Sequence, residues 1–273
     1  MCHNCIINDI RAGTLRRGVL GMIAASAVGL AAMPSLPAAA QVPTAGRRRV
    51  VDLTHTLTSD FPTYFGTPAF TLEPQFRFTN DGLNLNRITY PEHVGTHFDA
   101  PLHFSADGRS VDELPIESLV CPLAVVDVRA KAAVDADYRL TPDDIRSYEA
   151  VHGPIPESAC VVMNSGWDAH VGTSRFRGED AGKVLHFPGF HLEAADFLIR
   201  ERSVNGIGVD TLSLDHGPSK DSAVHYRVLP SNRYGIEGLA NLSSLPPTGA
   251  TLVAGAPKIK GGTGGPGRVI ALL

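Results

Sequence analysis

Six short runs of β-branched and other apolar residues recur along the chain, each bounded by glycine, proline or aspartate. This punctuation is typical of β-strands. Segments with a helical repeat lie between some of the runs. The alternation predicts an α/β fold, with a mixed β core flanked by helices. The predicted strands cover residues 49–53, 123–128, 160–163, 206–209, 251–253 and 269–272.

Two helices are expected between these strands. Thr141 is a good N-cap, and Pro142 suits the first helical turn, so a helix is predicted from there until Gly153. A second helix is predicted over 192–202, where apolar residues form an approximate stripe. We find no Pro- or Ser-rich linker, repeat or charge block, and therefore expect a single domain over residues 41–273.

The first forty residues differ in composition from the rest of the chain. Arg16 and Arg17 precede an apolar run at 19–32, and small residues follow up to Ala40. This arrangement resembles a twin-arginine signal peptide, which exports folded proteins to the bacterial periplasm. Because the apolar run is shorter than the about 20 residues of a membrane-spanning helix, we expect cleavage near Ala40 rather than a stable membrane anchor.

The composition excludes several classes of protein. With 43% hydrophobic and 19% charged residues and a formal net charge of −4, the chain is neither disordered nor a basic nucleic-acid binder. Its four cysteines are too few for a disulfide scaffold. Cys121 and Cys160 lie beyond the signal segment, and we expect two buried thiols there rather than a disulfide.

The strongest chemical signal is a cluster of potential metal ligands at residues 93–104. Gly95 and Pro101 disfavour a helix there and provide turns that would bring His93 and His103 alongside each other. Imidazole and carboxylate together suit Zn²⁺ or Mn²⁺ better than Ca²⁺ or Mg²⁺. A divalent metal site is therefore predicted. Its candidate residues are His93, His97, Asp99 and His103.

The same stretch reads H-x-G-T-H-x-D-x-P-x-H-F, a string that resembles the hallmark of the cyclase family of metal-dependent hydrolases. That family includes bacterial kynurenine formamidase and isatin hydrolase. The resemblance continues through 51–55 and 208–215 to His225 and Glu237. It implies a swivelling β/β/α fold and a homodimer or homotetramer.

The resemblance also implies roles for individual residues. It implies one or two ions of Zn or Mn per subunit, with Asp99 bridging to the second ion if there are two. The ligands of the first ion would be His93, His97 and Asp99, and those of the second would be His225 and Glu237. His103 would be the general acid/base.

Physical chemistry supports these roles independently. A bound divalent metal lowers the pKa of water towards about 7 and polarises a carbonyl group. His103, with an ordinary pKa of about 6.5, could take the water proton and return it to the leaving group. The chain offers no G-x-S-x-G nucleophile as a competitor. Asp210 and Asp215 are expected to brace the site through hydrogen bonds.

Aromatic residues are the candidates for substrate binding. Phe61, Tyr64 and Phe65 follow the first predicted strand, and Trp167 follows the strand at 160–163. Because ligand pockets are mostly apolar, we expect these residues to line a pocket for an aromatic small molecule. The glycine-rich segment 258–268 is predicted to be a mobile or substrate-adjacent turn.

The sequence thus predicts a periplasmic metal-dependent hydrolase that opens or cleaves a small cyclic amide, formamide or lactone through a metal-activated water. One alternative is a cyclase or lyase acting on a small carbonyl compound. Another is a periplasmic protein that binds a metal or solute without turnover. The amino-acid sequence alone leaves the substrate and the choice between Zn and Mn open.

Overall fold

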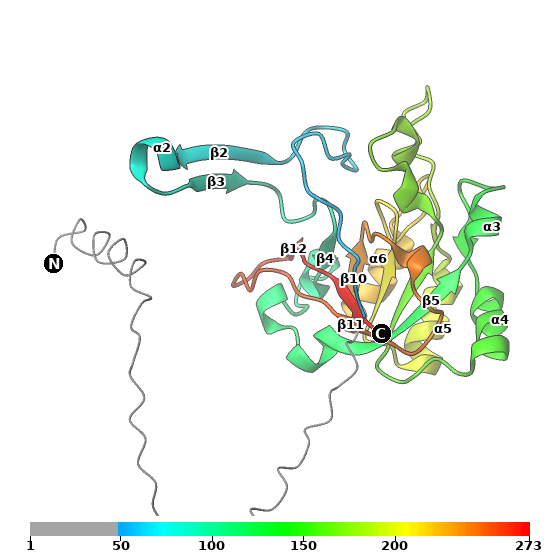
Figure 1. Ribbon diagram of the computed structural model, residues 1–273. Helices are drawn as coiled ribbons and strands as arrows, with labels where there is room; N and C mark the ends of the chain where they lie inside the picture. Colours follow the sequence, from blue (N-terminus) through cyan, green and yellow to red (C-terminus); the bar gives the residue numbers. More distant parts are fainter. Residues whose placement is uncertain (1–48) are drawn as a thin grey trace, which may run out of the picture. The chain divides into compact units, whose positions relative to one another are not determined.

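Nine strands form one curled, mixed sheet among the residues that the structure describes (Figure 1). The computed structural model describes residues 49–273, so the predicted signal peptide at 1–40 lies outside the described residues. The strand order is β1-β13-β11-β5-β7-β9-β10-β4-β12. The strands are β1 (Val50–Asp52), β4 (His97–Asp99), β5 (Val120–Asp127), β7 (Cys160–Asn164), β9 (Gly206–Val209), β10 (Tyr234–Glu237), β11 (Ala250–Val253), β12 (Gly264–Pro266) and β13 (Ile270–Leu272).

The middle of the sheet is parallel and buried on both faces. β5, β7, β9 and β10 run parallel, and the strands outside them are antiparallel. Neighbouring residues of a strand point to opposite faces. Ala124 and Val126 therefore pack against helices, while Leu123 and Val125 pack inside the curl of the sheet. Burial of each such Val or Leu side chain stabilises the fold by about 1.5–3 kcal/mol.

The helices α4 (Pro142–His152), α5 (Leu192–Arg202) and α6 (Ala223–Val228) cover one face of the sheet. Thr141 caps α4, because its Oγ1 accepts a hydrogen bond from the backbone N–H of Asp144. Both predicted helices and the α/β fold are confirmed. No helix within residues 49–273 is long and apolar enough to span a membrane. Shorter elements are α2 (Phe78–Asp81), α3 (Arg129–Ala132) and a small parallel pair, β6 (Arg139–Leu140) and β8 (Gly189–Phe190).

The β4 strand lies between two antiparallel neighbours at one end of the sheet. Asp99 faces Gly235 of β10 on one side and Gly264 of β12 on the other. The prediction of a turn throughout 258–268 is wrong at Gly264–Pro266, which form β12. A Cβ atom on Gly264 would lie 2.1 Å from the Phe98 carbonyl oxygen, so glycine is what allows this strand to pair with β4.

A separate hairpin consists of β2 (Thr71–Phe76) and β3 (Leu85–Thr89), drawn as the cyan arm in Figure 1. Every residue of both strands is exposed. Leu72 pairs with Ile88, and Phe76 pairs with Leu85. An isolated two-stranded hairpin is marginally stable in water, and this one also displays apolar side chains.

The two cysteines beyond the predicted signal segment are buried and free, which confirms the prediction of two thiols. Cys121 Sγ lies 3.5 Å from the hydroxyl of Tyr234. Burial raises the pKa of the Cys160 thiol well above its ordinary value. Both side chains therefore behave as small core residues rather than as nucleophiles.

Candidate active site

The predicted ligand stretch runs through β4 and into a short 3₁₀ helix at Pro101–Phe104. Gly95, at φ +67°, turns the chain just before the strand. His97 Nδ1 lies 3.0 Å from the Gly95 carbonyl oxygen, to which it donates. That hydrogen bond leaves His97 Nε2 free to face the interior of the cluster.

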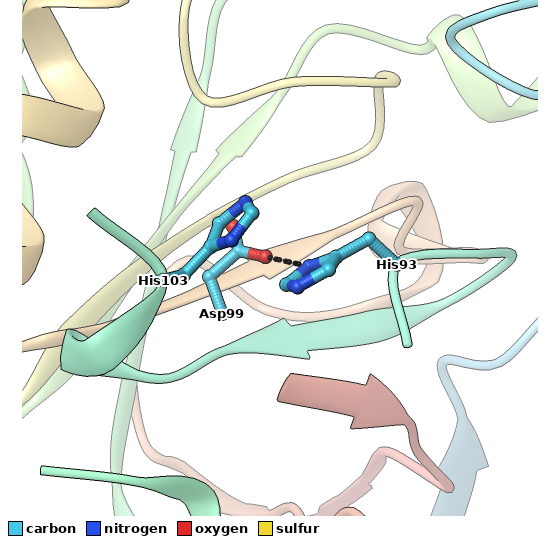
Figure 2. Close-up of side chains that lie close together, drawn as sticks. All are labelled: His93, Asp99 and His103. Carbon is cyan, nitrogen blue, oxygen red and sulfur yellow. Dashed lines mark hydrogen bonds and ion pairs between the residues drawn. The ribbon is translucent and has the colours of Figure 1, made fainter. Parts of the chain in front are cut away.

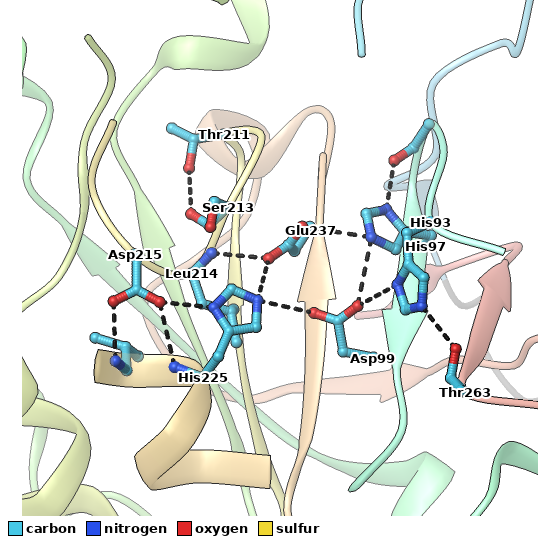
Figure 3. Close-up of polar contacts among 12 residues, drawn as sticks. His93, His97, Asp99, Thr211, Ser213, Leu214, Asp215, His225, Glu237 and Thr263 are labelled. Atoms are coloured by element: carbon cyan, nitrogen blue, oxygen red, sulfur yellow. Dashed lines mark hydrogen bonds and ion pairs between the residues drawn. The ribbon is translucent and has the colours of Figure 1, made fainter. Parts of the chain in front are cut away.

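Asp99 is the centre of the cluster, as Figure 3 shows. Its side chain is 1% exposed. Oδ1 lies 2.7 Å from His93 Nδ1 and 3.4 Å from His97 Nε2. Oδ2 lies 3.5 Å from His225 Nε2, and it is a buried atom without a hydrogen-bond partner. A buried carboxylate surrounded by imidazoles is a strong candidate for binding a cation.

Glu237 closes the cluster from the neighbouring strand β10. Its Oε2 lies 3.3 Å from His97 Nε2, and its Oε1 lies 3.0 Å from His225 Nε2. Oε1 also accepts a hydrogen bond from the backbone N–H of Leu214. The pairing of β4 with β10 therefore brings together two carboxylates that are 138 positions apart in the sequence.

Asp215 holds His225 in place from the loop that precedes α6. His225 Nδ1 lies 2.6 Å from Asp215 Oδ2, and the backbone N–H groups of Val224 and His225 donate to the same carboxylate. Carboxylates that accept from a ligating histidine fix its orientation and tautomer. Asp215 thus has the bracing role that the sequence predicted.

The two buried carboxylates of the cluster favour positive charge beside them. Burial alone would lower the pKa of His97, but the hydrogen bonds and charges of Asp99 and Glu237 outweigh burial and raise it to about 10. Burial would raise the pKa of Asp99, yet contacts with three imidazoles hold it well below its usual range. Protons on the imidazoles neutralise the two carboxylates here, and a divalent metal could replace those protons. The donor set of imidazole and carboxylate fits such an ion.

His103 stacks on His93, with ring centroids 3.7 Å apart and ring planes 19° apart (Figure 2). Burial lowers the pKa of His103 to about 4, and the nearby His93 and His225 contribute in the same direction. His103 is therefore neutral at pH 7 and can accept a proton.

Two groups of ligand atoms share Asp99. The atoms within each group lie within 4.8 Å of one another; one group is His93, Asp99 and His103, and the other is His97, Asp99 and Glu237. His225 Nε2 contacts Asp99 and Glu237, so the six residues predicted for metal binding and proton transfer meet in one place. The first group includes His103, for which the sequence predicted proton transfer rather than metal ligation.

A cavity of about 420 Å³ opens onto the cluster. Phe61, Tyr64 and Phe65 line it, as the sequence predicted for an aromatic pocket. Phe104 and Phe176 also line it. Among the residues that the structure describes, no lysine or arginine contributes to the cavity wall. The volume and the aromatic wall are typical of a site for a small organic molecule.

Trp167, also predicted as a substrate-binding residue, does not line this cavity. It is 2% exposed, and its Nε1 donates to the carbonyl oxygen of Phe176, so it packs directly behind the cavity wall. Asp210 accepts hydrogen bonds from Ser165 and from the backbone N–H of Trp167. This aspartate braces the turn that carries Trp167 rather than a histidine of the cluster.

Several cavity residues have no clear signal in the sequence. Phe176 comes from a short 3₁₀ turn, Ser174–Phe176, with no recognisable pattern. His216, which has no metal-ligand spacing to the other histidines, lines the cavity as well. Among the cavity residues that were not predicted, Phe104 had a usable signal, because it is the last residue of the motif that contains the ligands.

The curled sheet and the imidazole–carboxylate cluster together define the class: an α/β protein with a candidate metal-dependent active site at one end of its sheet. The chain belongs to the Cyclase family, whose model matches residues 51–216.

Proteins of related sequence and structure include two named enzymes. The chain is 34% identical to isatin hydrolase from Roseibium aggregatum, with 76% of this chain and 82% of that protein covered. It is 31% identical to kynurenine formamidase from Salinibacter ruber, covering 69% and 79% of the two chains. The crystal structure of an isatin hydrolase bound to the product analogue thioisatinate superposes with a TM-score of 0.78 at 28% identity, covering 100% of this chain and 99% of that one.

Proposed function

We propose that the protein is a metal-dependent hydrolase that opens the ring of a small, neutral aromatic lactam. One observation carries the proposal: buried imidazoles and carboxylates converge on Asp99 at the wall of an aromatic cavity. The likeness to isatin hydrolase and kynurenine formamidase supports hydrolysis of an amide C–N bond.

The cluster residues would hold the ion, and His103 would move the proton. A divalent metal bound there supplies a water of lowered pKa and polarises the substrate carbonyl. His103 is neutral at pH 7 because its pKa is about 4. It can accept a proton from the attacking water and deliver it to the leaving nitrogen. The aromatic wall holds the ring of the substrate and excludes bulk water.

The charge of the cavity favours a neutral substrate. Formylkynurenine carries an amino-acid carboxylate, and no lysine or arginine among the described residues lines the cavity to pair with it. An unpaired buried carboxylate is costly. A neutral bicyclic lactam such as isatin makes no such demand, and an aromatic lactone is the next best fit.

The test is turnover by the purified protein after metal removal and reloading with Zn²⁺ or Mn²⁺. We expect isatin to be hydrolysed with kcat/KM about 100-fold or more above that for formylkynurenine, because an unmatched charged group costs a few kcal/mol. In ¹⁸O-labelled water, one solvent oxygen should enter the acid product. No turnover of any lactam, formamide or lactone by the reloaded protein would contradict hydrolysis, and loss of water from the substrate would indicate a lyase.

We propose one or two ions of Zn²⁺ or Mn²⁺ per chain. Two ligand groups that share Asp99 support the higher number, and imidazole with carboxylate accepts both metals. Elemental analysis of the protein as isolated gives both the metal and the ratio of ions to chains.

We also propose that the protein is a homodimer or homotetramer. The exposed apolar residues of the β2–β3 hairpin support this, because Leu72 is 52% exposed and Ile88 is 53% exposed. Light scattering measures the assembly directly. Leu72→Asp should shift it towards the monomer, whereas Val134→Asp, at an apolar position that is 90% exposed elsewhere, should not.

We further propose export to the periplasm by the twin-arginine route. Arg16 and Arg17 and the small residues before residue 41 support this. Cell fractionation should find the cleaved protein in the periplasm, and replacement of both arginines with lysine should retain it in the cytoplasm.

A further inference from the structure

The hydroxyl group of Thr263 lies between a ligand histidine and a carboxylate. His93 Nε2 lies 3.0 Å from Thr263 Oγ1, as Figure 3 shows. On its other side, Thr263 Oγ1 donates to Glu92 Oε2. The backbone N–H of Thr263 donates to the second oxygen, Glu92 Oε1, at 3.0 Å. Both oxygens of Glu92 are thus directed at one residue.

The proton inventory of these groups fixes the direction of each hydrogen bond. A carboxylate only accepts, and a threonine hydroxyl has a single proton. Because Thr263 gives that proton to Glu92, its oxygen can only accept from His93. His93 therefore carries its proton on Nε2. Nδ1 faces Asp99 Oδ1, 2.7 Å away, and donates to it when no ion is bound; a metal ion would take the place of that proton and leave the proton on Nε2.

We propose that Glu92 and Thr263 are positioning residues, which hold His93 in the tautomer whose Nδ1 binds the metal. This inference rests on the proposed metal-dependent function. The other two histidines are held in the same manner, since His97 donates to Gly95 and His225 donates to Asp215. Each imidazole is fixed by an acceptor outside the cluster. For His93 this acceptor is the Thr263 hydroxyl, which in turn donates to Glu92, and we call the Glu92–Thr263 pair the relay.

The glycines on both sides of Thr263 explain how the relay fits. A Cβ atom on Gly262 would lie 2.9 Å from Glu92 Oε1, and one on Gly264 would lie 2.7 Å from His93 Cε1. Only a backbone without side chains can approach both partners this closely. The glycine-rich segment thus brings the Thr263 hydroxyl between Glu92 and His93.

The first measurement is the zinc affinity of the full-length protein. The protein is stripped of metal, and zinc is then titrated in competition with a chromophoric chelator. Thr263→Val removes the hydroxyl and keeps the shape, so the dissociation constant should rise about 10- to 100-fold. Thr263→Ser keeps the hydroxyl and should restore near-normal affinity. Thr54→Val is the matched control, because within residues 49–273 the Thr54 hydroxyl bonds only to the backbone of Val269. It should leave zinc affinity unchanged.

The tautomer gives a second, independent readout. In the zinc-loaded protein, ¹⁵N NMR of the histidine rings should show a proton on His93 Nε2 and the metal on Nδ1. Glu92→Gln places an amide that can donate to Thr263, which frees the threonine proton to point at His93 and favours the opposite tautomer. Its zinc affinity should fall by a similar factor. This variant decides the matter if Thr263→Val fails to fold.

The outcomes separate the relay from the proposed function. If the wild-type protein binds neither Zn²⁺ nor Mn²⁺, the metal-dependent function is wrong and the relay falls with it. If the wild type binds zinc but Thr263→Val and Glu92→Gln bind it equally tightly, only the relay is wrong. A zinc-bound Nε2 on His93 would likewise overturn it.

Discussion

His93 and His103 lie face to face, with ring centroids 3.7 Å apart, although ten positions separate them in the sequence. One ring carries a nitrogen that faces Asp99, and the other has a pKa of about 4 because burial disfavours its charged form. The pair therefore places a candidate metal ligand against a neutral base. That proximity makes the division of roles between the two rings experimentally accessible.

Replacement of His103 separates proton transfer from metal binding. We expect His103→Ala to lower kcat by about 10²- to 10⁴-fold while the zinc content stays the same, because a lost general base costs that much. Activity and elemental analysis of the same sample check this. His152→Ala, at an exposed histidine on α4, is the control. Loss of zinc with the activity would instead make His103 a ligand.

Zinc affinity should increase with pH. In the protein without an ion, the pKa of His97 is about 10, so its imidazole is protonated at pH 7 and the ion must displace that proton. Affinity therefore rises from pH 6 to pH 8, by about tenfold per unit for each proton displaced. Titration calorimetry in buffers of different ionisation enthalpy counts the released protons. A flat affinity across this range would show that the ion binds without displacing a proton.

The two carboxylates should differ in their effect on the number of bound ions. Asp99 belongs to both ligand groups, so Asp99→Asn should abolish metal binding. Glu237 belongs to only one group, and Glu237→Gln should leave His93, His97 and Asp99 able to bind an ion. Elemental analysis after dialysis against a fixed zinc concentration compares the two. Equal metal content in both variants would contradict a shared Asp99.

Arg177 should influence substrate affinity more than the chemical step. Its guanidinium donates to the carbonyl oxygens of Thr63 and Tyr64 and also pairs with Glu179, and it thereby holds the aromatic loop at the cavity. We expect Arg177→Met to raise KM several-fold with little change in kcat, since the loop binds ground and transition states alike. Steady-state kinetics test this, with Arg268→Met as control. A fall in kcat with unchanged KM would argue against a binding role for the loop.

The sequence was sufficient for the ligands because their chemistry is concentrated in one stretch. His93, His97 and Asp99 lie within seven residues, and an isolated histidine such as His225 could be added only through its resemblance to a family. The structure brings His225 and Glu237 to the same point by pairing β10 with β4. Strand pairing of this kind is a long-range choice that local patterns do not encode.

Residues that support the ligands could not be predicted for the same reason. Thr263 lies 170 positions after His93, and only the pairing of β12 with β4 makes them neighbours. The glycines in 258–268 indicated a turn because glycine favours turns locally. Close packing against β4 nevertheless makes Gly264–Pro266 a strand. Trp167 illustrates a related limit, because a large aromatic side chain suits a cavity wall and the layer behind it equally well.

The position of Asp99 between two glycines has an evolutionary consequence. A Cβ atom on Gly235 would lie 3.0 Å from Asp99 Oδ2, and one on the opposite neighbour, Gly264, would lie 2.7 Å from His93 Cε1. We therefore expect an alanine at either glycine to displace Asp99 or His93 and to lower activity, although no ligand itself is replaced. A homologue could therefore keep every residue of the ligand motif and still be inactive, and a search based on that motif alone would classify it as active.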